Sequence, residues 1–178
     1  MPSAGLLGDS VRVGRIVIRR FQPEDAECIW NLHRAALAGT GAEADERVWW
    51  DLRDIQANFL AKDGEFLIGL VEDELVAMGG VVPMSRERVE VKRMRVHPQW
   101  QRRGFGAAIL RALEEYSLRR GHSLAHLETT EIQATALFLY KSQGYTEVGR
   151  FTEVGLVVVQ LQKRLAPIEL SAQNSRSR

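Results

Sequence analysis

The chain of 178 residues is 45% hydrophobic and 26% charged, and its formal net charge is +1. These values are ordinary for one soluble globular domain and exclude a strongly basic nucleic-acid-binding protein. The single cysteine, Cys28, excludes an intramolecular disulfide framework and a zinc site of several cysteines, and we expect a buried structural thiol. No run approaches about 18 consecutive apolar residues, and the first residues lack the apolar core of a signal peptide. We therefore expect a cytoplasmic protein without a membrane span.

Composition divides the chain into one domain and two loose ends. Residues 1–14 are small and glycine-bearing and follow no periodic pattern, which predicts a flexible N-terminus. Residues 166–178 are polar and predict a disordered tail. The intervening residues, 15–165, carry strand and helix patterns without an internal repeat, so we expect them to form a single domain.

Two helical patterns dominate the first third of this domain. Pro23, followed by two acidic residues, is typical of a helix start. His33 lies on the apolar stripe of this helix, where a packed histidine is more common than a site residue. A second helix is predicted over residues 45–61. Its adjacent Trp49 and Trp50 cannot both face one core, so one of them either lines a cleft or a dimer surface or is a loosely packed surface tryptophan.

Strand patterns dominate the rest of the chain, interrupted by two further helices. The predicted strands, with the first one included, are residues 15–21, 66–71, 75–82, 89–96, 123–128, 145–151 and 156–162. The two further helices are predicted at residues 107–120 and 133–143. This order predicts an α+β fold with a mixed, mostly antiparallel sheet of about seven strands flanked by about four helices. Only the crossovers through the last two helices are expected to form parallel units.

A glycine-bearing turn joins the strand at residues 89–96 to the helix at residues 107–120. Its sequence is Gln101-Arg102-Arg103-Gly104-Phe105-Gly106. The two glycines let a ligand approach the main chain, and the N–H groups at the start of the helix suit a phosphate. The two arginines add full charges at the same place. We interpret the turn as a pyrophosphate cradle, and the alternative is an ordinary connection between a strand and a helix.

Several segments, in the right order, resemble the GNAT superfamily of acyl-CoA-dependent N-acetyltransferases. The turn fits the Q/R-x-x-G-x-G/A signature of that family, and the preceding Met94-Arg95-Val96-His97-Pro98 resembles its cofactor-binding strand. A third match, to the L-Y-x-x-x-G-F/Y segment, is Leu139-Tyr140-Lys141-Ser142-Gln143-Gly144-Tyr145. A further match, to the family's opening strand and helix start, is Arg19-Arg20-Phe21-Gln22-Pro23-Glu24-Asp25. The resemblance runs from residue 16 to residue 165, nearly the whole chain.

The resemblance implies two splayed central strands, here residues 89–96 and 123–128, with acetyl-CoA between them. The backbone groups of Met94 and Val96 would pair with the pantetheine amides as a neighbouring strand would. Gln133 stands where the family usually has an asparagine that contacts the cofactor or a bound water, and the longer side chain moves the amide by one methylene. The resemblance thus assigns the cofactor to Met94, Arg95, Val96, Gln101, Arg102, Arg103, Gly104, Phe105, Gly106, Ala107 and Gln133.

The same resemblance implies the catalytic groups. Tyr140 matches the tyrosine that protonates the departing sulfur, and an ordinary phenol with a pKa of about 10 suits a CoA thiolate. The alternative is a tyrosine that only packs. A general base for the amine is expected at Glu90 or Glu128, although either carboxylate could instead only balance nearby arginines. Strict alternation along the strand places Glu90 on one face with Lys92, Met94 and Val96.

Charge is distributed unevenly along the chain. Residues 86–103 contain seven basic and two acidic residues, which suits the phosphates of CoA, and residues 22–54 contain eight acidic and three basic residues. The acidic segment favours a cationic acceptor, unless its charges only cover solvated helix faces. We expect acetyl transfer from acetyl-CoA to a primary amine of a small amine, an amino acid or a protein. The alternative is a non-catalytic acyl-CoA-binding sensor. No nucleic acid, membrane or metal is expected as a partner, and a homodimer is compatible with this interpretation.

Overall fold

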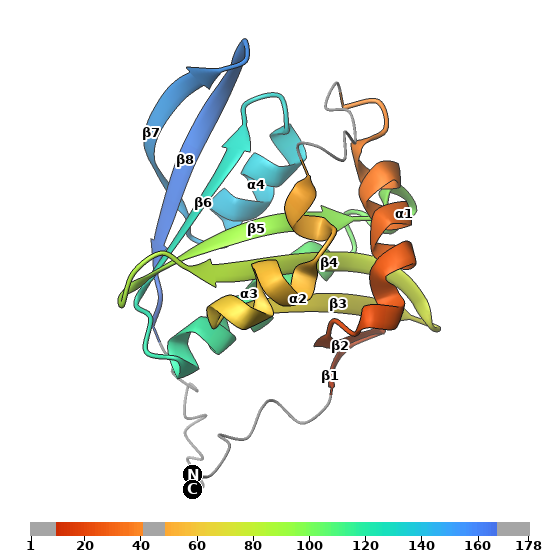
Figure 1. Ribbon diagram of the computed structural model, residues 1–178. Coiled ribbons are helices and arrows are strands. Elements are labelled where there is room, and N and C mark those ends of the chain that lie inside the picture. Colours follow the sequence, from red (N-terminus) through yellow and green to blue (C-terminus); the bar gives the residue numbers. More distant parts are fainter. Residues whose placement is uncertain (1–9, 41–48, 167–178) are drawn as a thin grey trace, which may run out of the picture.

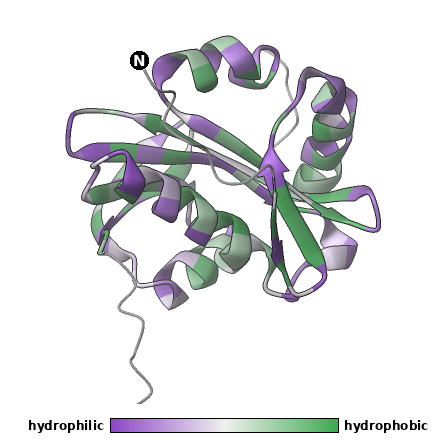
Figure 2. Cartoon of the chain, turned by 90° about the horizontal axis from the view of Figure 1, so that it is seen from below, coloured by the Kyte–Doolittle hydropathy of each residue, from purple (hydrophilic) through white to green (hydrophobic). Residues whose placement is uncertain are grey.

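The computed structural model describes residues 10–40 and 49–166, which form one sheet with helices on both faces (Figures 1 and 2). The eight strands of this part of the chain are β1 (Val11–Val13), β2 (Ile16–Arg20), β3 (Glu65–Val71), β4 (Glu74–Pro83), β5 (Arg88–Val96), β6 (Leu124–Thr130), β7 (Thr146–Glu153) and β8 (Leu156–Arg164). Its α-helices are α1 (Ala26–Leu37), α2 (Ile55–Asn58), α3 (Phe105–Arg119) and α4 (Ala134–Ser142). Among these strands the order is β1-β2-β3-β4-β5-β6-β8-β7, and only β5 and β6 pair in parallel.

The predicted mixed, mostly antiparallel sheet is confirmed, with one strand more than expected. The additional strand, β1, pairs with β2 and lies inside the segment 1–14 that was expected to be flexible. The remainder of the two expected loose ends, residues 1–9 and 167–178, lies outside the described residues. The crossover through α4 does not form a parallel pair, because β8 lies between β6 and β7.

The prediction of a continuous second helix over residues 45–61 is wrong for the part that the structure describes. That part consists of two 3-10 turns, Trp50–Leu52 and Leu60–Lys62, on either side of the one-turn helix α2. The break comes at Asp54, whose Oδ1 accepts the N–H of Ala57 at 2.8 Å and thereby caps a new helix. Apolar side chains at helical spacing still gather in one core, which explains why the pattern suggested a helix.

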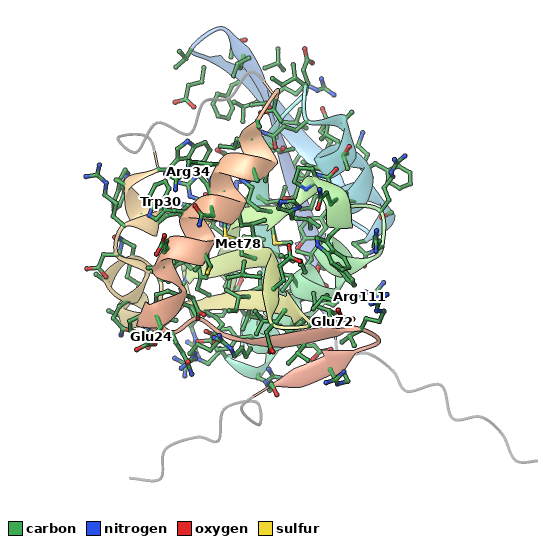
Figure 3. The ribbon with its side chains drawn as sticks, turned by 90° about the vertical axis from the view of Figure 1, so that its right-hand side faces the viewer. Glu24, Trp30, Arg34, Glu72, Met78 and Arg111 are labelled. Atoms are coloured by element: carbon green, nitrogen blue, oxygen red, sulfur yellow. The ribbon has the colours of Figure 1, made fainter. Side chains whose placement is uncertain are left out.

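Two apolar cores lie on opposite faces of the sheet. On one face α3 packs on β3, β4 and β5, with Ile109 and Leu113 fully buried in the α3-side core. On the other face α1 packs on β4 and β5, where Met78 lies in the α1-side core. Figure 3 shows α1, with Trp30 and Arg34 labelled, crossing in front of the strand that carries Met78. Both faces of β5 are therefore covered by helices.

The two central strands separate as the resemblance implied. Parallel pairing of β5 with β6 is limited to three residue pairs, which end at Glu90 and His126. Beyond this point β5 continues to Val96 beside β4, and β6 continues to Thr130 beside β8 (Figure 1). The sheet is thus split from its middle outward, between two strands that each keep one antiparallel neighbour.

A β-bulge lies in β5 at the start of this split. Its register with β4 shifts so that Arg93 and Met94 together lie opposite Gly79. Arg93 has a left-handed φ of 57°, as the inserted residue of some bulges does. A Cβ on Gly79 would lie 2.3 Å from the sulfur of Met94, so the glycine makes room for the methionine on the α3 face.

The bulge overturns the predicted alternation along β5. One inserted residue exchanges the two faces of every position that follows it. Met94 and Val96 therefore do not share a face with Glu90; they pack against the α3-side core. The α1 face instead carries Glu90 and Lys92 before the bulge and Arg95 after it, as their contacts with residues of the α1 side show.

Cys28 is exposed, so the expectation of a buried thiol is wrong. The buried positions of α1 are Ile29, Leu32, His33 and Leu37, and Cys28 lies outside the face that these four residues define. Within residues 10–40 and 49–166, no helix combines the length and the apolar character that crossing a membrane requires.

Candidate acetyl-CoA and catalytic site

The turn before α3 has the backbone geometry of an anion-binding cradle. Arg102 and Gly104 have left-handed φ angles of 58° and 82° on either side of Arg103, and alternating conformations of this kind direct N–H groups into one concavity. The N–H of Ala108 bonds the carbonyl of Gly104 at 3.0 Å, which leaves the first three helical N–H groups for a ligand. A Cβ on Gly104 would meet no atom within 4 Å. The residues present therefore fit a pyrophosphate.

One of the two arginines is held at this cradle by stacking. The guanidinium carbon of Arg103 lies 4.7 Å from the ring centre of Trp100, and that ring lies 5.9 Å from the ring of Phe105. A guanidinium placed over an aromatic face keeps its charge and loses part of its freedom. Arg102 is exposed on the same turn. Arg103 is thus the better positioned of the two for a phosphate.

Packing accounts for some residues that the sequence assigned to the cofactor. Phe105 is buried in the α3-side core. A Cβ on Gly106 would lie 3.1 Å from Leu139 and 3.3 Å from Val96, so close packing explains this glycine. The side-chain amide of Gln101 donates to the carbonyl of Val96 at 3.3 Å, which gives a local partner to a group expected to pair with pantetheine.

Tyr140 lies on α4, which Figure 1 shows in the opening between β5 and β6. Gln133 is the N-cap residue of α4, and its Oε1 accepts from the hydroxyl of Thr129 at 3.3 Å. Tyr140 is buried, and burial raises its pKa to about 12, although the charge of Arg95 acts in the opposite direction. The ordinary phenol pKa assumed from the sequence is therefore too low. The hydroxyl keeps its proton throughout the usual pH range.

Both candidate carboxylates lie in the strands that border the split. Glu90 is half-buried, with Lys92 Nζ at 3.5 Å, and Glu128 is exposed and accepts from Gln160 at 2.8 Å. Between them is a residue that sequence reasoning missed: His126 is buried, pairs in register with Glu90, and has its Nε2 3.6 Å from Glu128 Oε1. Its alternation with Glu128 along one strand is the signal that could have indicated it.

Charged and aromatic side chains gather on the α1 face of β5. We call this set the charged cluster: His33, Trp49, Asp51, Glu90, Lys92, Arg93 and Arg95. Asp51 accepts from Arg93 Nε through both oxygens, at 2.8 and 3.0 Å, and lies 3.8 Å from Lys92 Nζ. The guanidinium carbons of Arg93 and Arg95 lie 4.3 and 5.1 Å from the centre of the Trp49 ring. Of the two adjacent tryptophans, one of which was expected to line a cleft or a dimer surface, Trp49 is thus a support for two cations and Trp50 is exposed.

Burial controls protonation within the charged cluster. His33 has no exposed surface; burial, followed by the charges of Arg95 and Arg93, lowers its pKa to about 4, so the ring is neutral. Burial also lowers the pKa of Arg95 to about 10. Local motifs could not reveal this cluster, because Asp51 and Arg93 are 42 positions apart and meet only in the folded chain.

Three of the described carboxylates of the acidic segment 22–54 already have partners within the protein and give no support to a cationic acceptor. Asp25 accepts from Arg19 at 2.7 and 2.8 Å, Asp51 belongs to the charged cluster, and Asp54 caps α2. These carboxylates are used inside the protein. Three of the other acidic residues of the segment lie at positions 41–48, outside the described residues.

Comparison with known proteins gives one family. The model of the acetyltransferase (GNAT) family matches residues 26–145. A mouse protein described as probable N-acetyltransferase family 8 member 5 is 27% identical over 115 residues, which are 60% of this chain and 49% of that protein. The chain spans about half the length of the named relatives it matches.

Solved structures give the same fold. A GNAT-family acetyltransferase from Staphylococcus aureus Mu50 has a TM-score of 0.78 at 17% identity, covering 85% of this chain and 99% of that one. The yncA protein of Salmonella typhimurium, solved with its cofactor acetyl-CoA, has a TM-score of 0.71 at 20% identity, covering 90% and 99%. Since the family model covers more than half of the residues, the chain belongs to the acetyltransferase (GNAT) family, whose cofactor is acetyl-CoA.

Proposed function

We propose that this protein transfers the acetyl group of acetyl-CoA to a primary amine by direct attack in a ternary complex, with Tyr140 as the general acid. The observation that carries the proposal is the buried hydroxyl-bearing side chain at the split of the sheet. Tyr140 packs in the α3-side core, and Glu90 and His126 form the last pair of β5 with β6 before the strands separate. The amine could belong to a small amine, an amino acid or a protein.

The cofactor would be held by main-chain groups and one stacked cation. The first N–H groups of α3 and the side chain of Arg103 would take the pyrophosphate, while the backbone of β5 from Met94 to Val96 would take the pantetheine. When bound, acetyl-CoA supplies the thioester that is the acyl donor. No metal is required for this chemistry, because the amine is the nucleophile.

Two proton transfers accompany the reaction, one from the amine to a base and one from an acid to the departing sulfur. As the C–N bond forms, the amine gives a proton to Glu90, or to His126 supported by Glu128. As the C–S bond breaks, Tyr140 gives its proton to the departing sulfur. The pKa of about 12 does not prevent this transfer, because burial that raises the pKa of a phenol also raises the basicity of a thiolate in the same place.

A turnover screen tests the proposal. Acetyl-CoA is mixed with the protein and with amines of each class, and free thiol is measured against a reaction without amine. Amine-dependent thiol release is expected. Tight binding of acetyl-CoA by calorimetry without release for any amine would contradict the enzyme and favour an acyl-CoA sensor. Absence of both binding and release would contradict both readings.

A further inference from the structure

Arg95 has no carboxylate partner within the described residues, unlike the other cations of the charged cluster. Asp51 binds Arg93 through both oxygens, and Lys92 lies between Asp51 and Glu90, at 3.8 and 3.5 Å. His33 is neutral at physiological pH. The cluster therefore contains three cations and two carboxylates, and the uncompensated positive charge belongs to Arg95. An uncompensated charge away from water is costly unless a ligand of opposite sign completes it.

The hydrogen-bonding edges of Arg95 show where such a ligand would bind. Nη1 donates to the carbonyl of Met94 at 2.8 Å, whereas Nε is shielded from solvent and has no partner within the described residues. Nε and Nη2 form the edge of a guanidinium that binds the two oxygens of a carboxylate side by side. Trp49 lies under the guanidinium and restrains its plane. The side chain is thus oriented, partly accessible and short of one acceptor.

Arg95 also lies close to the site of transfer. It follows the bulge in β5, on the edge of the split, and its charge acts on Tyr140 across the opening. The pyrophosphate cradle lies at the other end of the connection, before α3, and has its own arginine. A negative group at Arg95 would therefore belong to a part of a reactant near the reacting carbon, and not to the phosphates of the cofactor.

We propose that Arg95 binds a carboxylate that one of the two reactants carries next to its reacting group. This inference rests on the proposed acetyl-transfer function and narrows it. Two sources share this chemistry: the α-carboxylate of an amino-acid acceptor, and the free carboxylate of a dicarboxylic acyl group. The role belongs to the side chain of Arg95 and is separate from the backbone contact with pantetheine.

Matched substrates distinguish the two sources. In the first arm, acetyl-CoA is used with amino acids and the corresponding amino amides, for example glycine with glycinamide and phenylalanine with phenylalaninamide. In the second arm, succinyl-CoA and acetyl-CoA are compared with the amides as acceptors. Each comparison is made for the wild type, Arg95→Gln and Arg95→Lys, with Arg88→Gln at the far end of β5 as the matched control. Because the same pairs are used for every variant, the intrinsic reactivity of each substrate cancels.

The expected result is a preference in kcat/KM of about tenfold or more for the carboxylate-bearing member of one arm, the range for a hydrogen-bonded charge. The preference should fall to about twofold or less in Arg95→Gln, be partly kept in Arg95→Lys, and be unchanged in Arg88→Gln. Acetyl-CoA affinity should stay the same in all four proteins. Preference in the first arm assigns the carboxylate to the acceptor, and preference in the second assigns it to the acyl group.

Failure of this inference can be told apart from failure of the proposed function. Turnover with equal rates for acids and amides in both arms, or a preference that survives Arg95→Gln, would overturn the role of Arg95 and leave acetyl transfer intact. If no amine is turned over, calorimetry of the CoA complex with N-acetylglycine and N-acetylglycinamide, and with succinyl-CoA in place of CoA, still decides. Arg95-dependent preference for a carboxylate supports the inference, and its absence in both titrations overturns it.

Discussion

The two faces of β5 differ in what they contain and in how they hold it. On the α3 side the strand presents apolar side chains to a core that is sealed by α3. On the α1 side it presents Lys92, Arg93 and Arg95 to a cluster in which charges are paired over short distances. The apolar face places the start of α3, and with it the turn that fits a pyrophosphate. The charged face places electrostatic groups beside the proposed transfer site.

This difference between the two faces predicts which substitutions in β5 should lower stability and which should lower activity. Apolar packing tolerates exchanges between hydrophobic side chains of similar volume, whereas removing either partner of a buried ion pair leaves an uncompensated charge. Changes on the charged face should therefore cost more stability than changes of similar size on the apolar face. Changes at the split between β5 and β6 should cost activity.

The largest effect is expected from Asp51→Ala, which removes the carboxylate that two cations share. Arg93 would remain largely buried without its partner, and the free energy of unfolding should fall by about 3–5 kcal/mol. Urea denaturation measures the loss. The matched control is Asp54→Ala, which removes only the cap of α2 and should cost about 1 kcal/mol. Equal losses for the two variants would mean that the charged face is no more demanding than a surface cap.

The next effect concerns His33 and pH. Its pKa of about 4 in the folded protein lies below the ordinary value of about 6.5, so the unfolded state binds the extra proton. Stability from this group is complete above pH 6.5 and declines as pH falls toward 4, by up to about 3 kcal/mol. Denaturation at several pH values should show this decline in the wild type and a smaller one in His33→Leu. Parallel curves would exclude His33 as the cause.

A change at the split itself should affect turnover and little else. Tyr140→Phe removes one hydroxyl, and kcat should fall about a hundredfold or more while acetyl-CoA affinity stays constant. Tyr145→Phe is the control, because its ring lies only 5.9 Å from that of Tyr140. With a pKa of about 12, Tyr140 should produce no alkaline limb below about pH 11. Wild-type turnover by Tyr140→Phe would return the residue to a packing role.

Substitutions at Gly106 and Gly104 compare a tightly packed position with an open one at the start of α3. Gly106→Val should lower the free energy of unfolding by about 1–3 kcal/mol, because its side chain would press on Leu139 and Val96. Gly104→Ala meets no neighbour, so its cost, about 1–2 kcal/mol, comes from the left-handed backbone alone. Thermal unfolding and acetyl-CoA titration of both variants check this. A stable Gly106→Val with weakened acetyl-CoA binding would mean that this glycine serves cofactor approach and not packing.

The smallest effect is expected at the exposed arginines of the cradle. Arg103→Gln should weaken acetyl-CoA binding by about 1 kcal/mol, at the low end for a charged contact because the side chain is exposed. Arg102→Gln, without a stacking partner such as Trp100, should cost less. Both losses should shrink at high salt. Calorimetry at two ionic strengths makes the measurement, and two variants with unchanged affinity would show that these charges do not contact the cofactor.

Much of the fold could be predicted because its signals are local. The strand periods, the glycine-bearing turn and the acidic helix start each follow from neighbouring residues, and the mixed, mostly antiparallel sheet was predicted from them. The split of the sheet was implied only by the resemblance to the GNAT superfamily. The prediction of one continuous second helix was wrong because Asp54 caps a new helix in the middle of an apolar pattern of helical spacing. The predicted burial of Cys28 was wrong because a shift of one position along a helix decides whether a side chain faces inward.

The turn that is proposed to hold the cofactor could be recognised from the sequence, and the charged face could not. Because this turn consists of consecutive residues, its motif can be recognised in the sequence. The charged cluster combines α1, the segment around Asp51 and β5, and the pairing of Asp51 with Arg93 needs both the fold and the bulge. Alternation predicted the wrong partners for Glu90, because strict period two was assumed across the adjacent charged residues Lys92 and Arg93, where the apolar positions shift from 89 and 91 to 94 and 96.

The bulge in β5 also sets a rule for changing this protein. Arg93 is the inserted residue of the bulge, and its side chain also binds Asp51. Any substitution at this position leaves the length of β5 unchanged, so Arg95 stays on the charged face. Deletion of Arg93 would remove the bulge together with its inserted residue, so Met94 alone would lie opposite Gly79 and Arg95 would stay opposite Met78, on the charged face. In this segment the inserted residue and the bulge must therefore be kept or lost together.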